Sequence, residues 1–164
     1  MSSAKELVGA IMVYVDGTEG SIAAAQYAVL LARAVGAELI AGYIVNTRAL
    51  SDLVKTRIFL QEEQEEYQRD IEIDADRYLN HVREFAESKG VAIDLCKRSG
   101  NVHQEIRKLV EERSVDLLII GELSKIRSRR DEFFNEAERA MRGVACTVLI
   151  VKDEERVWDL FDKA

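Results

Sequence analysis

Four cations gather in one short stretch of an otherwise acidic chain, and they are the residues whose type and spacing most suggest binding chemistry. They are Lys125, Arg127, Arg129 and Arg130. Together they could hold a phosphate group, because arginine presents forked donors that match phosphate oxygens. They could equally form a solvated basic loop that pairs with Asp131, Glu132 and other acidic residues nearby. The residues themselves leave both interpretations open.

Other reactive side chains are scattered. His81, His103, Cys96 and Cys146 stand too far apart to match the spacing of a metal site, and no serine lies in a nucleophile elbow. We therefore predict no catalytic site, no metal and no enzyme activity. The two histidines are expected on the surface. The two cysteines are expected to be buried, reduced thiols in a cytosolic protein.

Phosphate-binding glycine motifs of the common kinds are absent. The chain has no Walker loop, and Gly17 with Gly20 do not supply the three spaced glycines of a dinucleotide fold. A response-regulator receiver would need an acidic phosphoacceptor after its third strand, where this chain has Cys96-Lys97. The basic stretch is therefore the one anion-binding candidate.

Composition limits the partners. A chain of 164 residues with a net charge of −7 fits one soluble domain and lacks the basic surplus of a general nucleic-acid binder. The polar N-terminus and the absence of any apolar run near 20 residues predict no signal peptide, no membrane span and a cytoplasmic location.

Short apolar runs alternate with longer segments of helical period, which is typical of a parallel sheet covered on both faces. The expected strands are 8–15, 38–45, 91–96, 116–120 and 146–151. Helices are expected from Ile22 to a cap near Gly36, along a stripe from Tyr67 to Phe85, from Val102, and over 132–142. The first of these has Ile22, Gln26, Val29, Leu30 and Ala34 at helical spacing, with Thr18 or Ser21 as its cap. The acidic residues between Glu62 and Asp76 are expected to form a solvated helix face.

The two most apolar strands, 8–15 and 116–120, should be central neighbours, which gives a doubly wound α/β sheet of order 3-2-1-4-5. The winding then reverses between the first and fourth strands, and ligands bind beyond the carboxyl ends of strands at such a point. The loops 16–21 and 121–130 would line that crevice.

These segments resemble the universal stress protein family. The likeness rests on VYVDGTEGSIAAAQYAVLLARAVGAELIAGYIV near the start, Ser99-Gly100, VDLLIIG at 115–121 and ERAMRGVACTVLIV at 138–151. Family members that bind ATP carry three spaced glycines after the fourth strand, the last followed by Ser or Thr. Here Gly121 is present, but Ser124 and the pair Phe134-Asn135 stand at the other positions, and Glu122 adds a repelling carboxylate. The resemblance therefore implies a member with a degenerate ATP-binding motif.

The same resemblance places Asp16 and the backbone around Val45 in the nucleotide crevice. Asp16 has a second possible role, which is to fix its own turn or cap the following helix. The residues of the candidate nucleotide crevice are Asp16, Val45, Gly121, Ser124, Arg127, Arg129, Arg130 and Asn135. No cofactor is expected, with ATP as the possible exception.

The last predicted strand, between Cys146 and Val151, would be an apolar sheet edge without proline or inward charge, so it needs cover. The family pairs this strand across a homodimer, which we expect here. The tail 153–164 follows the domain 1–152, and its Val157, Trp158, Leu160 and Phe161 could instead cover the edge or reach the other subunit. Two functions follow: a stress-response protein acting through protein contacts without nucleotide, or an adenine-nucleotide sensor with an arginine-rich loop.

Overall fold

The chain folds around one five-stranded parallel sheet of order β3-β2-β1-β4-β5, as the sequence predicts. The structure is a computed structural model that describes residues 4–47, 61–122 and 136–164. The strands are β1 (Ala10–Tyr14), β2 (Glu38–Asn46), β3 (Asp94–Gly100), β4 (Leu117–Gly121) and β5 (Thr147–Val151). The helices are α1 (Ala4–Leu7), α2 (Glu19–Val35), α4 (Gln61–Ser88), α5 (Val102–Glu112), α7 (Glu136–Gly143) and α8 (Glu154–Lys163).

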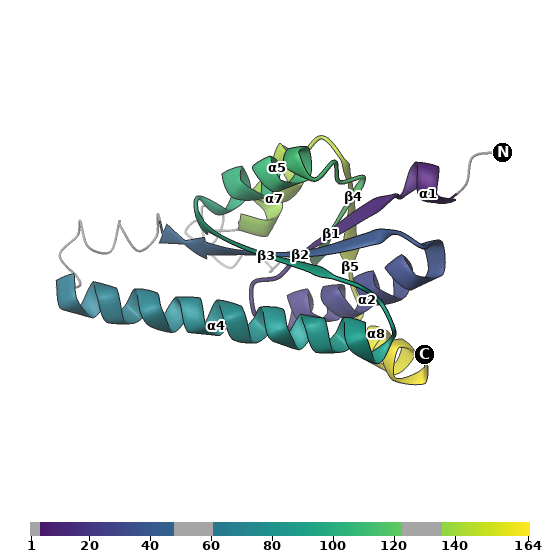
Figure 1. Cartoon of the computed structure of the whole chain (residues 1–164), viewed down its shortest axis with the longest axis horizontal. Coiled ribbons are helices and arrows are strands. Elements are labelled where there is room, and N and C mark those ends of the chain that lie inside the picture. The colour runs from purple at the N-terminus through teal and green to yellow at the C-terminus, as the bar shows by residue number, and fades with distance from the viewer. Residues whose placement is uncertain (1–3, 48–60, 123–135) are drawn as a thin grey trace.

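Helices cover both faces of the sheet (Figure 1). One face carries α2, α4 and α8 over Ile11, Val13 and Leu39, and the other carries α5 and α7 over Met12, Ile40 and Leu118. Successive side chains of a strand point to opposite faces of the sheet. The same apolar strands therefore contribute to two separate cores, one on each face.

One carboxylate, that of Asp116, links the two central strands of the sheet. Asp116 Oδ2 accepts hydrogen bonds from the backbone N–H groups of Gly9 at 2.8 Å and Ala10 at 2.9 Å, at the start of β1. The N–H of Asp116 in turn donates to the carbonyl of Ala10 at 2.9 Å. The start of β1 is therefore tied to the start of β4, more than a hundred residues later in the chain.

The third strand differs from its prediction. It begins at Asp94 instead of Val91 and continues to Gly100, beyond the predicted end at residue 96. Gly100 is paired with Asn46 at the end of β2. Because β3 is an edge strand with exposed side chains, polar residues are tolerated in it, and hydrophobicity does not mark where it ends.

The buried face of α2 also differs from its prediction. Gln26 and Leu30 are only partly buried and Ala34 is exposed, whereas the side chains that pack inward are small. The buried residues of the helix are Ser21, Ala23, Ala24, Ala25, Ala28, Val29 and Ala32. This alanine stripe lets the helix axis approach the sheet closely, and the larger residues turn away from it. Thr18 caps the helix and Gly36 ends it in the left-handed conformation, as expected.

The long helix α4 follows its predicted stripe. Ala75 and Val82 are fully buried, Tyr78 and Phe85 are partly buried, and Tyr67 is exposed. Most carboxylates of its N-terminal half are exposed, as a solvated helix face requires.

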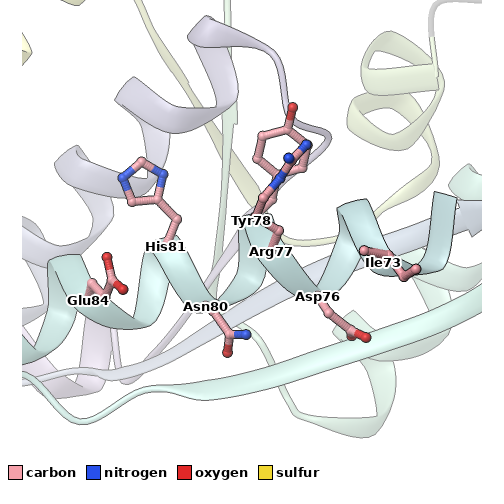
Figure 2. Close-up of a pocket in the computed structure, with 7 residues that line it drawn as sticks. All are labelled: Ile73, Asp76, Arg77, Tyr78, Asn80, His81 and Glu84. Atoms are coloured by element: carbon pink, nitrogen blue, oxygen red, sulfur yellow. The ribbon is translucent and has the colours of Figure 1, made fainter. Parts of the chain in front are cut away.

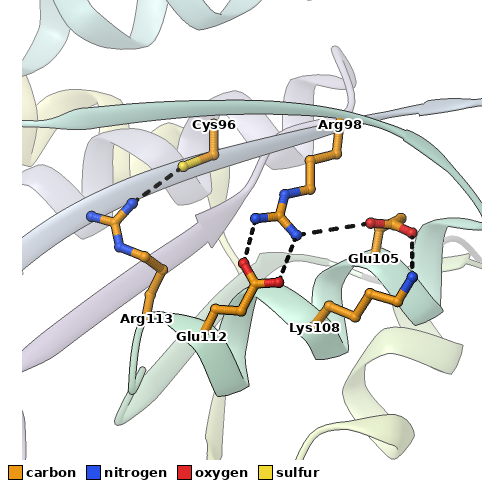
Figure 3. Close-up of polar contacts among 6 residues, drawn as sticks. All are labelled: Cys96, Arg98, Glu105, Lys108, Glu112 and Arg113. Atoms are coloured by element: carbon orange, nitrogen blue, oxygen red, sulfur yellow. Dashed lines mark hydrogen bonds and ion pairs between the residues drawn. The ribbon is translucent and has the colours of Figure 1, made fainter.

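An ion-pair network joins β3 to α5 (Figure 3). Arg98 contacts Glu112 and, at 4.0 Å, Glu105, while Lys108 contacts Glu105 at 2.9 Å. These contacts raise the pKa of Arg98 and lower the pKa of Glu112, mainly through their mutual hydrogen bond. These ion pairs hold the edge strand β3 against α5, since β3 itself buries few apolar side chains.

A second guanidinium lies at the other end of β3. Arg113 contacts Asp94 at 2.5 Å, Glu38 at 3.1 Å and the Cys96 sulfur at 3.5 Å. Both Cys96 and Cys146 are free and only partly buried, so the prediction of buried thiols was wrong in degree. Burial nonetheless raises the pKa of the Cys146 thiol.

The C-terminal tail forms α8 and packs on its own chain. Val157 and Phe161 are buried, and the Phe161 ring meets Phe85 of α4 edge-on with centroids 5.3 Å apart. Lys89 of the segment after α4 lies 4.6 Å above the Phe161 ring and donates to the carbonyl of Ala164 at 3.4 Å. The tail therefore extends the layer formed by α2 and α4.

We predict that Phe161→Ala lowers the free energy of unfolding by about 3–4 kcal/mol, because it removes a buried aromatic ring and leaves a cavity. Trp158→Ala is the control, because it removes another aromatic ring of α8 that is 37% exposed. It should cost about 1 kcal/mol or less. Urea denaturation of both variants measures the difference. Equal losses would show that α8 does not pack as described.

Candidate functional site

The loop after β1 is held by a closed set of hydrogen bonds. Asp16 Oδ1 accepts from the N–H of Thr18 at 3.0 Å and from its hydroxyl at 2.6 Å. The N–H of Asp16 donates to Ser21 Oγ at 3.2 Å, and Ser21 Oγ donates to the Thr18 carbonyl at 3.0 Å. Asp16 therefore fixes its own turn. This is the role that was expected of it besides a place in the nucleotide crevice.

An aromatic pair packs against this loop. Gly17 has φ +82°, and a Cβ placed there would lie 2.5 Å from the Tyr78 ring, so both the conformation and the contact require glycine. Tyr78 stacks on Tyr43 with centroids 6.4 Å apart and planes 6° apart, and Arg77 lies 5.5 Å from its centroid. Figure 2 shows Tyr78 and His81 directed from α4 toward the loop and α2, while Asp76 and Asn80 point away from them.

Gly121 is required by backbone packing. A Cβ on Gly121 would lie 2.4 Å from the carbonyl carbon of Gly20 and 2.8 Å from the Ser21 nitrogen. A Cβ on Gly20 would in turn lie 3.5 Å from the Glu122 nitrogen and 3.7 Å from Glu154 Oε1. The end of β4 thus touches the first turn of α2 directly, main chain against main chain.

Tyr14, the last residue of β1, packs between the sheet and α7. Its ring is buried in the second core, below the start of α7. Burial, with the nearby carboxylates of Asp16 and Glu136, raises the pKa of Tyr14 far above its usual value. The pKa of Tyr43 is raised in the same direction, first by burial and then by Asp16. A neutral phenol and two carboxylates therefore meet at the carboxyl end of β1.

Glu136 joins two helices at this place. Its Oε2 lies 3.4 Å from His103 Nδ1 in the first turn of α5, and its Oε1 lies 3.7 Å from Arg139. His103 is partly buried by this contact, whereas His81 is exposed and packs on Phe85 at 4.6 Å. Both histidines reach the surface as expected, with His81 exposed and His103 half-buried beside Glu136.

Three of the predicted site residues are described, and the fold brings Asp16 and Gly121 to the same crevice edge. Val45 is buried and pairs with Ser99 in the β2–β3 ladder. The other five predicted residues lie outside the described residues: Ser124, Arg127, Arg129, Arg130 and Asn135. Lys125 and the Phe134 ring lie outside them as well.

Sequence reasoning missed Tyr14, Tyr78 and Glu136. Tyr14 was available as a signal, because it is the one aromatic residue in an aliphatic strand that ends at the switch point. Tyr78 and Glu136 gave no such signal, since a helix stripe and a helix start explain them equally well. Within the described ranges no group of three His, Cys, Asp or Glu side chains could hold a metal ion. No described helix is both long and apolar enough to cross a membrane.

The fold and its crevice define a doubly wound α/β protein with its switch point between β1 and β4. The model of the universal stress protein family matches residues 8–152, so the chain belongs to the universal stress protein family.

Individual relatives agree with this. The universal stress protein MJ0531 of Methanocaldococcus jannaschii is 28% identical over 152 residues, covering 89% of this chain and 83% of the relative. The solved structure of the hypothetical protein MJ0577 superposes with a TM-score of 0.69 at 19% identity, covering 90% of this chain and 97% of that one. A universal stress protein from Burkholderia pseudomallei gives a TM-score of 0.68 at 19% identity, with coverage of 90% and 98%. At 19% identity, the similarity to these two structures shows a shared fold.

We predict that Gly121→Ala destabilises the domain by about 2–4 kcal/mol, because the new methyl group meets backbone atoms that cannot rotate away. Gly143→Ala is the matched control, since nothing lies within 4 Å of its Cβ position and it is in a helix. It should be neutral or stabilising by up to about 1 kcal/mol. Denaturant midpoints and slopes decide; similar losses in both variants would contradict the backbone contact.

We also predict that stability falls at alkaline pH through Tyr14. Below pH 10 the phenol is neutral in both states, and above it the unfolded chain ionises while the folded phenol, with its raised pKa, does not. Ionisation therefore favours the unfolded chain by up to about 1.4 kcal/mol per pH unit. Comparing unfolding at pH 9 and pH 11, Tyr14→Phe should lose less stability than the natural sequence. Identical losses would contradict the burial of this phenol.

Proposed function

We propose that this universal stress protein acts in the stress response through contacts with other proteins, without bound nucleotide and without catalysing a reaction. The observation that carries the proposal is the burial of the Tyr14 ring at the carboxyl end of β1, with the carboxylates of Asp16 and Glu136 near it. The phosphates of a nucleotide bound there would be repelled by these two carboxylates, and the described arginine nearest to them, Arg139, is already paired with Glu136 at 3.7 Å.

The helix N-termini at this sheet edge supply a second argument. Phosphates bind where backbone N–H groups at a helix start are unsatisfied. The start of α2 is capped by Thr18 and lies beside Glu154, α5 is capped by Asn101, and α7 carries Glu136 in its first turn. The positive ends of all three helices are therefore met by the chain's own oxygen atoms.

The sequence departs from the ATP-binding motif in the same sense. Ser124 and Phe134-Asn135 replace glycines whose lack of a side chain lets the backbone approach a phosphate. Gly121 keeps its place, and its packing against α2 accounts for it without any ligand.

The second candidate function is an adenine-nucleotide sensor that binds ATP through its degenerate loop. Arginines 127, 129 and 130 favour it, because their charge could replace the missing backbone donors. Among solved universal stress proteins of this fold, one is a complex with cAMP and one from Arabidopsis thaliana has AMP bound. In that case Asp16, Val45 and Asn135 would complete the crevice.

We further propose a cytoplasmic homodimer paired through β5. Val148, Leu149 and Ile150 are only partly buried, and β4 is the neighbour of β5 within the chain. An apolar edge of this kind is covered in stable proteins. The tail 153–164 belongs with the domain 1–152 in this arrangement, because α8 packs on α2.

Titration calorimetry of Mg-ATP into the purified protein tests the main proposal. We expect no binding heat up to millimolar ATP, because the phosphate-binding glycines are replaced and carboxylates lie at the carboxyl end of β1. The sensor function predicts micromolar binding instead, which is lost in Arg129→Ala/Arg130→Ala and kept in the control Arg107→Ala/Arg142→Ala, whose arginines lie on α5 and α7. That pattern would replace the proposal with the sensor.

A further inference from the structure

A groove runs between α2 and α8 on the outer surface of the helix layer. It has a volume of about 390 Å³ and is lined by the apolar side chains of Tyr27, Leu30, Leu31 and Leu160, with Arg33 and Arg156 beside them. The residues from α2 belong to its C-terminal half, whereas the crevice lies at the N-terminal end of the same helix. The groove is therefore separate from the crevice.

Tyr27, Leu30 and Leu31 pack against the edge of the core but keep part of their apolar surface exposed. α2 packs on the sheet through its alanine stripe, and Tyr27, Leu30 and Leu31 lie outside that stripe and are only partly buried. α8 packs inward through Val157 and Phe161, which leaves Leu160 41% exposed. A helix layer that served only to cover the sheet would place polar side chains here.

The charges beside the groove are positive in a chain of net charge −7. Arg156 and Lys163 flank Leu160 at steps of four and three, so the three share one side of α8, while Glu155, Asp159 and Asp162 fall on another. Neither Arg33 nor Arg156 forms an ion pair with a described residue, in contrast to Arg98, Arg107 and Arg113. The groove thus combines an apolar floor with unpaired cations at its sides.

We propose that this groove docks an acidic amphipathic helix of a partner protein. Apolar side chains at successive helical turns would enter between α2 and α8, and flanking carboxylates would pair with Arg33 and Arg156. This inference rests on the proposed action through protein contacts and names the chemical class of the partner. A basic helix is disfavoured because its charges would face two arginines.

The test uses the full chain, labelled with ¹⁵N, and an end-blocked peptide of about five helical turns. The peptide carries leucines at helical spacing, glutamates on both flanks and alanines elsewhere. We expect saturable shifts of backbone signals confined to residues 27–33 and 156–164. Arg33→Glu/Arg156→Glu should weaken binding by about tenfold or more, and a peptide with lysines in place of the glutamates should bind this variant better than the natural sequence.

Arg107→Glu/Arg142→Glu is the matched control, because it makes the same charge change on α5 and α7 and should leave peptide affinity unchanged. The proposal is overturned if no shifts occur at millimolar peptide, if they map elsewhere, or if both double variants weaken binding equally.

The occupant could instead be a second copy of this chain. Sedimentation tests this: if Leu160→Asp turns a dimer into a monomer and the peptide binds only the monomer, the groove is a self-interface and the proposal falls. If the peptide does not bind the groove and calorimetry detects no binding of Mg-ATP, only the docking proposal is overturned and the proposed function stands. If Mg-ATP binds and the peptide also binds the groove, the docking proposal stands and only the absence of nucleotide from the proposed function is overturned.

Discussion

The contact between the main chain of Gly121 and that of Gly20 and Ser21 sets the distance from α2 to the sheet, and much of the structure depends on that distance. A helix that approaches so closely can bury only small side chains, which is why its inner face is a stripe of alanines. The larger residues of α2 are then displaced outward. They form the surface on which α8 packs and, beside it, the apolar groove.

The same closeness shapes the crevice at the switch point. With α2 pressed against the end of β4, the loop after β1 has to turn within a few residues, and it does so through Asp16, the left-handed Gly17 and Ser21. Tyr78 then packs on Gly17 from one side, and Tyr14 fills the space under α7 on the other. Asp16 and Gly121, which belong to the loops predicted to line the crevice, are thus engaged in contacts within the protein itself. Surfaces outside the crevice are therefore the more informative place to look for function.

The sequence was sufficient for the sheet and insufficient for the side chains that fill the crevice. Strand order followed from the apolar runs and from the handedness of crossovers, because both are properties of the chain that tertiary contacts do not reverse. The inner face of α2 was assigned wrongly since hydrophobicity favours Leu30 over Ala28, while the close approach to Gly121 favours the smaller residue. Likewise the sequence presents Glu136 as an ordinary carboxylate of the helix predicted over 132–142, and only the packing of α7 on α5 brings it near Tyr14 and His103. Asp16 and Gly121 lie at the carboxyl ends of β1 and β4, and the contacts that the structure gives them are with the protein's own loop and backbone.

The carboxylate of Asp116 has a consequence for how the protein is made. It binds the N–H groups of Gly9 and Ala10, so the middle of the sheet joins parts of the chain that leave the ribosome about a hundred residues apart. At ordinary rates of translation that interval is roughly 5–20 seconds. During it β1 can pair with β2 but has an open edge where β4 belongs. The nascent N-terminal half therefore exposes its most apolar strand until β4 has emerged, and this interval is when a chaperone would have something to protect.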